Sequence, residues 1–445
     1  MKTSITRRAF LRRTTLSTAG VLAAPYITSG LRAASPNETV LHASFGSSGQ
    51  ATSDINSLTR GGAAKLVAVA DVDLNRVAAV KRRFPDAKVY QDWRELLEKE
   101  KTLDSVNVTV PDHMHAVMAM SAMQLGKHVY CQKPLTHDIY ETRRLTEFAR
   151  EKKLVTQMGI QIHSSATYRQ AVQIVQAGTI GPVKEVHAWS NKKWGDMEPL
   201  PSRTDAIPDG LNWDHWLGTA SARPFLGGSY FHPGNWRKRL DFGTGTFGDM
   251  GCHIYDPVFN ALELTAPISV RSEGPAPTLW NWAINTIVQY VFPGTKFTAE
   301  KTVNMTWYDG DARPPQEVQA LLGQTRLPDQ GSIFIGTKGA MLLPHIANAR
   351  LFPEKDFEGW QRPTVEEHDH WLQFVEAVRG NGRTSANFDY AGPLTETVLL
   401  GSVACRFPQT TLRWDAKELK FNNLAEADRL LRRQYRAGWE AKGLS

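Results

Sequence analysis

The feature that most constrains the fold of this chain is an alternation of short strand patterns with helix patterns between residues 40 and 160. Residues 65–70 (KLVAVA) combine β-branched residues with alanine, which is typical of a strand buried on both faces of a sheet. Strands that alternate with helices at this spacing predict parallel βαβ units in an open, doubly wound sheet. We place this α/β domain at residues 37–158. The expected strands are 40–44, 65–70, 88–90, 105–110, 128–131 and 155–160, and the expected helices are one that ends at Leu58 and others at 74–84, 93–99, 115–125 and 140–152.

The remaining residues, 159–445, have a different pattern and predict a second domain of the α+β class. Segments 282–292 and 296–306 alternate apolar with polar residues, which is typical of antiparallel strands. We therefore expect a large, mostly antiparallel open sheet in this domain. The other expected elements are a hairpin at 331–343 and helices at 368–378 and 394–406.

The N-terminal segment, residues 1–34, concentrates basic residues and carries no acidic one. Its arginine pair, Arg7 and Arg8, precedes a weakly apolar stretch over residues 16–27 and a pair of small residues, which resembles a twin-arginine (Tat) signal peptide. The apolar stretch is too short to span a bilayer as a stable helix. We therefore expect export to the periplasm or another exported location, with a basic tail and an uncleaved membrane anchor as the alternatives.

The charge of the chain argues against nucleic-acid binding once this segment is set aside. The whole chain has a formal net charge of +7, but residues 1–34 carry six basic residues. The net charge of +1 that is left for the remainder gives no reason to expect a basic binding surface.

The three cysteines, Cys131, Cys252 and Cys405, are widely spaced. They are too few for a disulfide framework in a chain of this length, and their spacing is not that of metal ligands. We expect them to be small buried apolar residues.

A glycine-rich turn between the first strand and the first helix predicts a dinucleotide site and hence a Rossmann domain. Residues 46–51 read G-x-S-x-x-A in place of G-x-G-x-x-G, and the small residues still permit close approach of the backbone to a pyrophosphate. Asp71 follows the second strand, where a carboxylate accepts hydrogen bonds from ribose hydroxyls and repels a 2′-phosphate, so NAD is favoured over NADP. A plain loop and a helix-capping Asp71 are the alternatives. The residues expected to hold NAD here are Gly46, Ser48, Gly49, Gln50 and Asp71.

Three further segments resemble motifs of one family, the Gfo/Idh/MocA oxidoreductases, which includes glucose–fructose oxidoreductase and inositol dehydrogenase. Residues 109–115 (TVPDHMH) are similar to its T-x-P-D-x-x-H, and residues 126–135 (GKHVYCQKPL) to its G-K-H-V-x-x-E-K-P-x. Residues 243–256 (GTGTFGDMGCHIYD) are similar to its G-G-G-x-x-x-D-x-G-x-H-x-x-D. The likeness runs from about residue 38 to the C-terminus and is closest to secreted bacterial members with Tat signals. It implies the same two-domain fold, a nicotinamide cofactor and a homo-oligomer formed through the second domain's open sheet. Because the Tat route handles folded proteins, we expect this cofactor to be tightly bound.

The resemblance also implies roles for three catalytic residues. Oxidation of a carbinol needs a hydride acceptor, a base for the hydroxyl proton and a group that stabilises the developing alkoxide. Lys133 follows a short strand at the carboxyl edge of the sheet and is expected to bind the reacting oxygen. His253 is expected to be the base, and Asp249 to orient it or bind substrate. A structural histidine on this helix is the alternative.

Two departures from the family pattern bear on the site. The glycine turn is altered, and Gln132 stands where the family usually has Glu. Gln keeps the size and the hydrogen-bonding capacity but removes a charge, so a neighbouring carboxylate is not expected to tune Lys133. The further residues assigned to the cofactor are Pro111, His115, Gln132, Lys133 and Gln161.

Sugars present apolar C–H faces and hydroxyl edges, which suit aromatic and polar side chains together. Five tryptophans fall between Trp189 and Trp236, in Pro/Gly/Asp-rich sequence, and most of them are expected to be packing residues. The Asp249, His253, Asp256 spacing places three polar groups on one helix face and also suggests a metal site, but the family motif explains these residues without a metal. We expect no metal. The residues assigned to substrate are Trp194, His232, Arg237 and Asp256.

The sequence therefore predicts an exported, NAD-dependent oxidoreductase that acts on a CH–OH group of a sugar, polyol or glycoside. Because free NAD is scarce outside the cytoplasm, a second hypothesis is a redox-neutral enzyme that cleaves a glycoside by oxidation and elimination. A third is a sugar-binding protein without catalysis, against which Lys133 and His253 argue. The expected partner is a small carbohydrate or polyol, with no nucleic acid and no membrane beyond the export signal.

Overall fold

The structure is a computed structural model that describes residues 39–444. The signal peptide predicted at residues 1–34 lies outside the described residues. Within the described part of the chain, no helix is long and apolar enough to cross a membrane.

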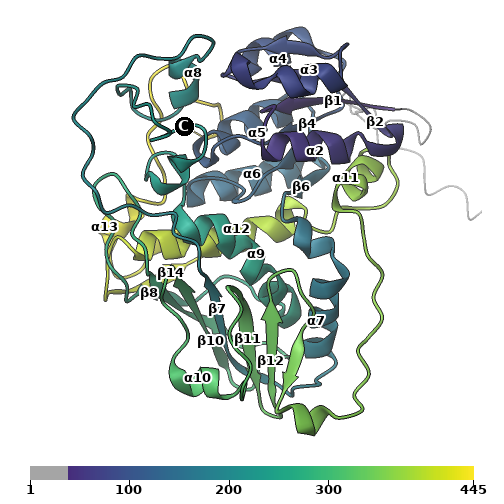
Figure 1. The fold of residues 1–445 in the computed structure, drawn as a ribbon, viewed down its shortest axis with the longest axis vertical. Coiled ribbons are helices and arrows are strands. Elements are labelled where there is room, and N and C mark those ends of the chain that lie inside the picture. The colour runs from purple at the N-terminus through teal and green to yellow at the C-terminus, as the bar shows by residue number, and fades with distance from the viewer. Residues whose placement is uncertain (1–38, 445) are drawn as a thin grey trace, which may run out of the picture. The chain divides into compact units, whose positions relative to one another are not determined.

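The first sheet is a six-stranded Rossmann sheet, in which every neighbouring pair of strands is parallel (Figure 1). Its strand order, β3-β2-β1-β4-β5-β6, reverses direction between β1 and β4, and ligands bind at such a switch point, beyond the carboxyl ends of the strands. The strands are β1 (Val40–Phe45), β2 (Ala64–Ala70), β3 (Lys88–Tyr90), β4 (Ser105–Val108), β5 (His128–Cys131) and β6 (Thr156–Met158). All six strands expected from the sequence are therefore present.

The helices of this part of the chain follow the expected order, with one difference. A single helix is expected at 74–84, but the structure has a 3-10 turn at Leu74–Arg76 and then α3 (Ala78–Arg83). The Asp73 carboxylate accepts a hydrogen bond from the backbone N–H of Asn75, which favours a tight turn directly after β2. The other helices are α2 (Gln50–Leu58), α4 (Trp93–Lys99), α5 (His115–Gln124) and α6 (Ile139–Lys152).

The second sheet has nine strands and is mostly antiparallel, as expected; β7 and β10 form its parallel pair. Its order is β13-β12-β11-β7-β10-β9-β8-β14-β15. The strands expected at 282–292 and 296–306 begin later than predicted, because residues 282–286 and 294–301 form loops. The strands are β7 (Val183–Ser190), β8 (Ser269–Ser272), β9 (Ile287–Pro293), β10 (Thr302–Asp309), β11 (Gln330–Gly336), β12 (Ala340–Pro344), β13 (Arg350–Phe352), β14 (Thr411–Asp415) and β15 (Lys420–Phe421).

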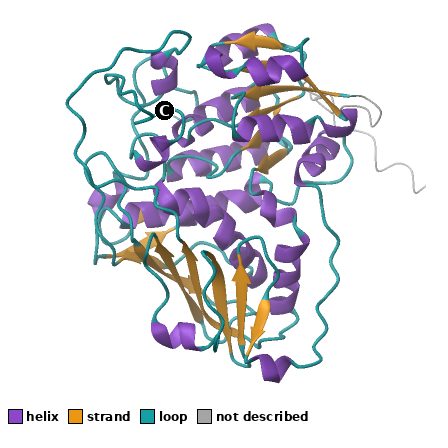
Figure 2. Cartoon of the chain, viewed as in Figure 1, coloured by secondary structure: helices purple, strands orange, loops and turns teal. Residues whose placement is uncertain are grey.

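Helices α9 and α12 lie between the two sheets, α7 packs against α9 beside the second sheet, and α12 also packs against α6 (Figure 1). Helix α12 begins before the predicted residue 394, because the Asn387 side chain caps it. In contrast, residues 191–244 are mostly loop (Figure 2). The helices are α7 (Ala166–Gln176), α8 (Trp213–Leu217), α9 (Gly245–Leu262), α10 (Gln316–Ala320), α11 (His370–Val378), α12 (Phe388–Ala404) and α13 (Ala425–Asp428).

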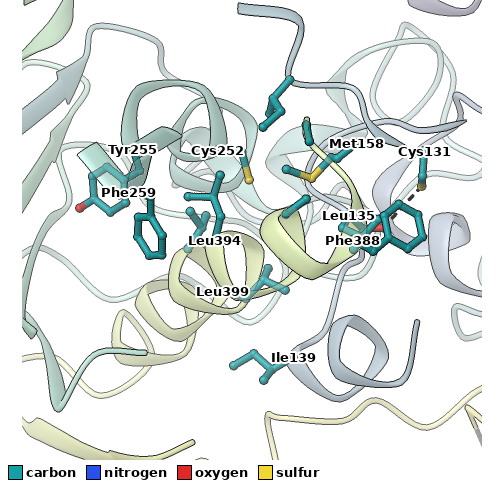
Figure 3. Close-up of a cluster of buried hydrophobic side chains, with 14 of the residues drawn as sticks. Cys131, Leu135, Ile139, Met158, Cys252, Tyr255, Phe259, Phe388, Leu394 and Leu399 are labelled. Atoms are coloured by element: carbon teal, nitrogen blue, oxygen red, sulfur yellow. Dashed lines mark hydrogen bonds between the residues drawn. The ribbon is translucent and has the colours of Figure 1, made fainter. Parts of the chain in front are cut away.

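One continuous apolar core joins the Rossmann sheet to the helix layer and the second sheet. Figure 3 shows three members of this core: Cys131 at the end of β5, Cys252 on α9 and Leu394 on α12. All three cysteines are free and buried, as predicted. The same core therefore holds both the end of β5, which Lys133 follows, and the helix that carries Asp249.

Candidate functional site

A cavity of about 580 Å³ runs from the glycine turn after β1, along the carboxyl ends of β2, β4 and β5, to α9. Of the predicted site residues, Asp256 alone does not line it. The predicted residues that line it are Gly46, Ser48, Gly49, Gln50, Asp71, Pro111, His115, Gln132, Lys133, Gln161, Trp194, His232, Arg237, Asp249 and His253.

The glycine turn at one end of the cavity has the backbone geometry that a pyrophosphate requires. Gly46 has φ +96°, and a Cβ atom there would lie 2.2 Å from the carbonyl oxygen of Thr109, just beyond the end of β4. Gly49 has φ +61° and open space where a side chain would be. Helix α2 begins here without a side-chain cap and without an acidic residue in its first turn, so its N-terminus is suited to an anion. These residues fit a dinucleotide.

Gly46→Ala is expected to lower both stability and NAD affinity. The new Cβ would collide with the backbone of Thr109, and alanine is strained at this positive φ. We therefore expect NAD affinity to fall by about tenfold or more. Gly62→Ala is a matched control, because Gly62 has φ +77° with nothing within 4 Å of its Cβ position. It should lose only about 1–2 kcal/mol of unfolding free energy. Thermal unfolding and NAD titration measure both; equal losses in the two variants would contradict the close-approach argument.

Asp71 and Arg76 bring a carboxylate and a cation to the same end of the cavity. Asp71 Oδ2 accepts hydrogen bonds from the backbone N–H (3.0 Å) and the hydroxyl (2.6 Å) of Ser47. Arg76 Nε donates to the hydroxyl of Ser48 at 2.7 Å. Arg76 is not among the residues predicted from the sequence, and its only signal there is its position five residues after Asp71. Such an arginine bears directly on the choice between NAD and NADP.

His115 and Gln161 reach the cavity while contacting the Rossmann sheet. His115 Nδ1 lies 2.8 Å from the carbonyl oxygen of Pro134, and Nε2 lies 2.9 Å from that of Val110. The imidazole thereby joins the loop after β4 to the loop that carries Lys133. Gln161 Nε2 lies 3.3 Å from the hydroxyl of Tyr130, to which it donates.

Gln132 contacts a buried carboxylate that the sequence analysis did not identify. Its Nε2 donates to Asp54 Oδ2 at 2.8 Å, and Thr109 donates to the same oxygen at 2.9 Å. A Cβ at Gly159 would lie 2.6 Å from the Gln132 amide, so this glycine makes room for it. Burial raises the pKa of Asp54, while its hydrogen bonds oppose that shift. A buried carboxylate of α2 therefore holds the Gln132 amide in place.

Lys133 has a carboxylate neighbour after all, in contrast to the expectation drawn from Gln132. Its ammonium donates to Asp249 Oδ1 and to the Asp249 backbone carbonyl, both at 2.8 Å. This carboxylate comes from α9 and not from the position beside Lys133 in the chain. Lys133 is largely buried, with 15% of its side chain exposed.

Asp249 is the centre of a cluster of cations and of one neutral N–H donor. Trp194 Nε1 donates to its Oδ2 at 3.0 Å, Arg237 Nε donates to its Oδ1 at 3.2 Å, and Lys192 Nζ lies 3.5 Å from Oδ2. Burial alone would raise the pKa of Asp249, but Lys133, Arg237 and Lys192 together hold it well below its ordinary value. Asp249 therefore stays ionised and cannot act as a proton acceptor at neutral pH.

His253 lies on the same helix and also lines the cavity, but its ring makes no hydrogen bond to any described residue. Asp249 is engaged with Lys133 and Arg237, so the predicted orientation of His253 by Asp249 is not found. Burial, and then the charge of Lys133, lower the pKa of His253 well below its ordinary value. The imidazole is therefore neutral at pH 7, which is the state in which it accepts a proton.

A second imidazole, His345, was missed by the sequence analysis. It follows β12, lines the cavity, and its ring centroid lies 5.8 Å from that of His253. Its Nδ1 lies 2.8 Å from the hydroxyl of Tyr168. Burial, with Lys192 and Lys133, lowers the pKa of His345 to about 4. No motif marks His345 in the sequence, because it reaches the site from a hairpin of the second sheet.

One residue assigned to substrate, Asp256, lies elsewhere than predicted. Asp256 is buried beside His163 Nδ1 (2.7 Å) and the hydroxyl of Tyr390 (2.6 Å), which donates to it. The helix face was predicted correctly, but seven residues carry Asp256 about 10 Å further along the axis than Asp249, beyond the cavity. The assignment of Asp256 to substrate is therefore corrected. His232 lines the cavity, but its Nε2 lies 2.9 Å from Asp73 Oδ2, beside the end of β2.

The tryptophans divide into wall and packing residues. Trp189 is buried on one face of the second sheet, and Trp213 stacks on Trp216 at 4.8 Å between ring centroids. Trp194 and Trp236 line the cavity with the Arg237 guanidinium near both rings. Among residues 39–444, no three His, Cys, Asp or Glu side chains converge as metal ligands would.

Comparison with known proteins agrees with this architecture. Residues 43–160 match the NAD-binding Rossmann fold of the Gfo/Idh/MocA oxidoreductase family, and residues 169–292 match the family's C-terminal alpha/beta domain. The chain belongs to the Gfo/Idh/MocA family of NAD(P)-dependent oxidoreductases. The match of the Gfo/Idh/MocA models includes Lys133, Asp249 and His253.

Curated relatives of this Gfo/Idh/MocA protein include dehydrogenases. Levoglucosan dehydrogenase from Pseudarthrobacter phenanthrenivorans is 26% identical over 192 residues, which is 43% of this chain and 40% of that protein. The scyllo-inositol 2-dehydrogenase (NAD(+)) from Bacillus subtilis is 31% identical over 118 residues, which is 26% of this chain and 34% of that protein. The chain thus matches well under half the length of these relatives.

Solved structures extend the likeness over most of the chain. The WlbA dehydrogenase from Bordetella pertussis, in complex with NADH and UDP-GlcNAcA, superposes with a TM-score of 0.60 and 13% identity, covering 85% of this chain and 99% of that one. At this level of identity, the likeness shows that the fold is shared.

Proposed function

We propose that this Gfo/Idh/MocA protein oxidises or reduces a hydroxyl group of a sugar, polyol or glycoside with NAD. The observation that carries the proposal is one cavity that begins at the glycine turn and ends between the Lys133 ammonium and the neutral imidazole of His253. The names of the levoglucosan and inositol dehydrogenases support a carbohydrate or polyol substrate.

The residues of the first half of the cavity would hold the cofactor. Gly46, Gly49 and the N-terminus of α2 are suited to the pyrophosphate, and Asp71 to the ribose hydroxyls. When bound, NAD supplies the hydride acceptor. We propose that it is tightly held.

The protein's own groups then perform the proton and charge chemistry. Lys133 has two of its three N–H groups on Asp249, so the third can donate to the substrate oxygen and stabilise the developing alkoxide. His253 accepts the hydroxyl proton. Asp249, held by Trp194 and Arg237, fixes the Lys133 ammonium in place. The exposed faces of Trp194 and Arg237 provide the platform for the sugar.

Mass analysis of the small molecules released from purified, heat-denatured protein tests this proposal. We expect NAD or NADH in a ratio near one per chain, and NADH formation with a subset of inositols, hexoses or glycosides. Protein that releases no nicotinamide dinucleotide, and that neither binds added NAD nor reduces it with any of these substrates, would overturn the proposal.

The preference for NAD depends on Asp71 and predicts a gain of NADP binding when its charge is removed. Asp71→Asn keeps the side-chain size, and Arg76 remains to pair with a 2′-phosphate, so NADP affinity should rise by about tenfold. In the double variant Asp71→Asn/Arg76→Gln, this gain should disappear. Fluorescence titrations with NAD and with NADP measure the two affinities. If Asp71→Asn leaves the NAD-to-NADP ratio unchanged, Asp71 does not set the preference.

A second candidate function is redox-neutral cleavage of a glycoside. The observation that favours it is His345, because elimination needs an acceptor for a carbon-bound proton in addition to the base at the hydroxyl, and a second neutral imidazole lies beside His253. Glycoside cleavage without accumulation of NADH would support this function, whereas NADH formation in proportion to product would exclude it.

We also propose that residues 1–34 direct export, on the strength of the arginine pair and the apolar stretch that follows it. Cell fractionation of the full chain tests this. The homo-oligomer stays a prediction.

A further inference from the structure

A second cavity, of about 210 Å³, lies where the start of α6, the loop before α9, helix α12 and the segment 429–433 meet. Part of its wall is apolar, with Leu240, Trp282 and Leu399. The rest is strongly basic: Arg406, Arg429, Arg432 and Arg433 all line it. No step of the proposed reaction uses these arginines.

The arginines of this cavity are poorly paired. Arg406 stacks over the ring of Trp282, with 5.0 Å to the ring centroid, and its guanidinium donates no hydrogen bond to any described residue. Arg432 lies over Tyr140 at 4.4 Å. Arg433 donates from Nη2 to the backbone carbonyl of Asp241 at 3.2 Å, and its buried Nε and Nη1 have no hydrogen-bond partner among the described residues. Buried N–H groups in folded proteins are nearly always bonded.

The acidic residues of the wall do not balance this charge. Asp241 pairs with Arg223, outside the cavity. Asp138 caps helix α6 and lies 3.3 Å from His137 Nδ1, and its nearest approach to Arg433 is 3.9 Å. Four arginines therefore line one small space with two carboxylates that are already engaged.

Ser402 supplies an independent observation. Its side chain lines the same cavity from α12 and is more than nine-tenths buried, with 7% of its surface exposed. Its hydroxyl has no hydrogen-bond partner among the described residues. Unpartnered buried hydroxyl and guanidinium groups on residues that line one cavity are donors of the kind that an oxyanion requires.

We propose that this cavity binds a small oxyanion: a phosphate, a sulfate or the carboxylate of a uronic acid. Arginine forks match the planar or tetrahedral oxygen pattern of such groups. The apolar wall formed by Leu240 and Trp282 leaves room beside the charge for the carbon body of a small anionic sugar. Thr244, which immediately precedes α9, also lines the cavity, so the bound anion lies next to the helix that carries Asp249 and His253.

Binding is tested by calorimetric titration of the full chain with phosphate, sulfate and glucuronate, at constant ionic strength. Excess NAD is present to occupy the other anion-binding position at α2. We expect saturable binding of at least one of the three, and no binding of glucose or chloride. Which anion binds most tightly distinguishes the inorganic ions from the sugar acid.

Arg406→Gln and Arg432→Gln should each weaken binding by about tenfold, the effect of losing one hydrogen bond to a charged group. Arg432 is exposed, so its variant gives a result even if Arg406→Gln fails to fold. Arg82→Gln is the matched control: it removes the same charge from an exposed position on α3 that lines neither cavity. Absence of saturable binding, or an equal loss in Arg82→Gln, would overturn the proposal. The proposal does not depend on the catalytic function.

Discussion

Lys133→Met is expected to lower kcat/KM by about 10²–10³-fold while leaving NAD binding nearly unchanged. The substitution keeps the length of the side chain but removes the N–H that would meet the developing alkoxide, and loss of one such donor costs about this much. Asp249 keeps Trp194 and Arg237 as donors, so the local structure should persist. Steady-state kinetics with the best substrate of the inositol, hexose and glycoside panel, together with NAD titration, measure the two effects separately.

Lys192→Met is the matched control for this prediction. Lys192 also approaches Asp249, at 3.5 Å, but 41% of its side chain is exposed, and it makes no hydrogen bond there. Its loss should change kcat/KM by only a few fold, since exposed pairs contribute about 1 kcal/mol or less. If Lys133→Met retains full activity, the assignment of Lys133 to catalysis is wrong.

The Rossmann half of the chain could be predicted because its signals are local. A buried strand such as β2 is recognisable from seven consecutive residues, and the glycine turn and Asp71 follow their strands directly. Strand β7 was not predicted. Lys192, which comes just after this strand, was therefore not predicted as a site residue either. A strand that mixes Lys, Glu and His with apolar residues, VKEVHAWS, has no clear alternation to detect.

The candidate site could be predicted as far as its motifs reach. Lys133, Asp249 and His253 line one cavity as the motifs indicate. The pairing of charges could not be predicted, because it joins elements far apart in the chain: Asp54 of α2 faces Gln132, and Asp249 of α9 faces Lys133.

The limits of periodicity are clearest for Asp256 and His345. Helical spacing fixes the face on which Asp256 lies, but not how far along the axis the cavity extends. His345 has no periodic or motif signal at all. It enters the site through the pairing of β11 with β12, which places the end of this hairpin near α9.

His253→Ala is expected to lower kcat by about 10²–10⁴-fold, the range for loss of a general base. Its ring makes no hydrogen bond to the described residues, so the fold should be little affected. His345→Gln is the comparison: for simple hydroxyl oxidation its effect should be much smaller, because one base suffices, whereas glycoside cleavage by elimination should suffer from both substitutions. Rates of NADH formation and of glycoside cleavage, measured on both variants, separate these cases.

The pH dependence of the reaction supplies an independent check on His253. An imidazole acts as a base in its neutral form, so activity falls as pH decreases through the pKa of the imidazole. Burial, and then Lys133, place the pKa of His253 well below the ordinary 6.5, so the acid limb of kcat/KM should lie below pH 6.5. In Lys133→Met the charge that depresses this pKa is gone, and the imidazole should titrate at a higher pH than in the parent protein. NMR titration of the His253 ring measures this without requiring activity; a ring that titrates near pH 6.5 in the parent protein would show that it is not held in the neutral state by its surroundings.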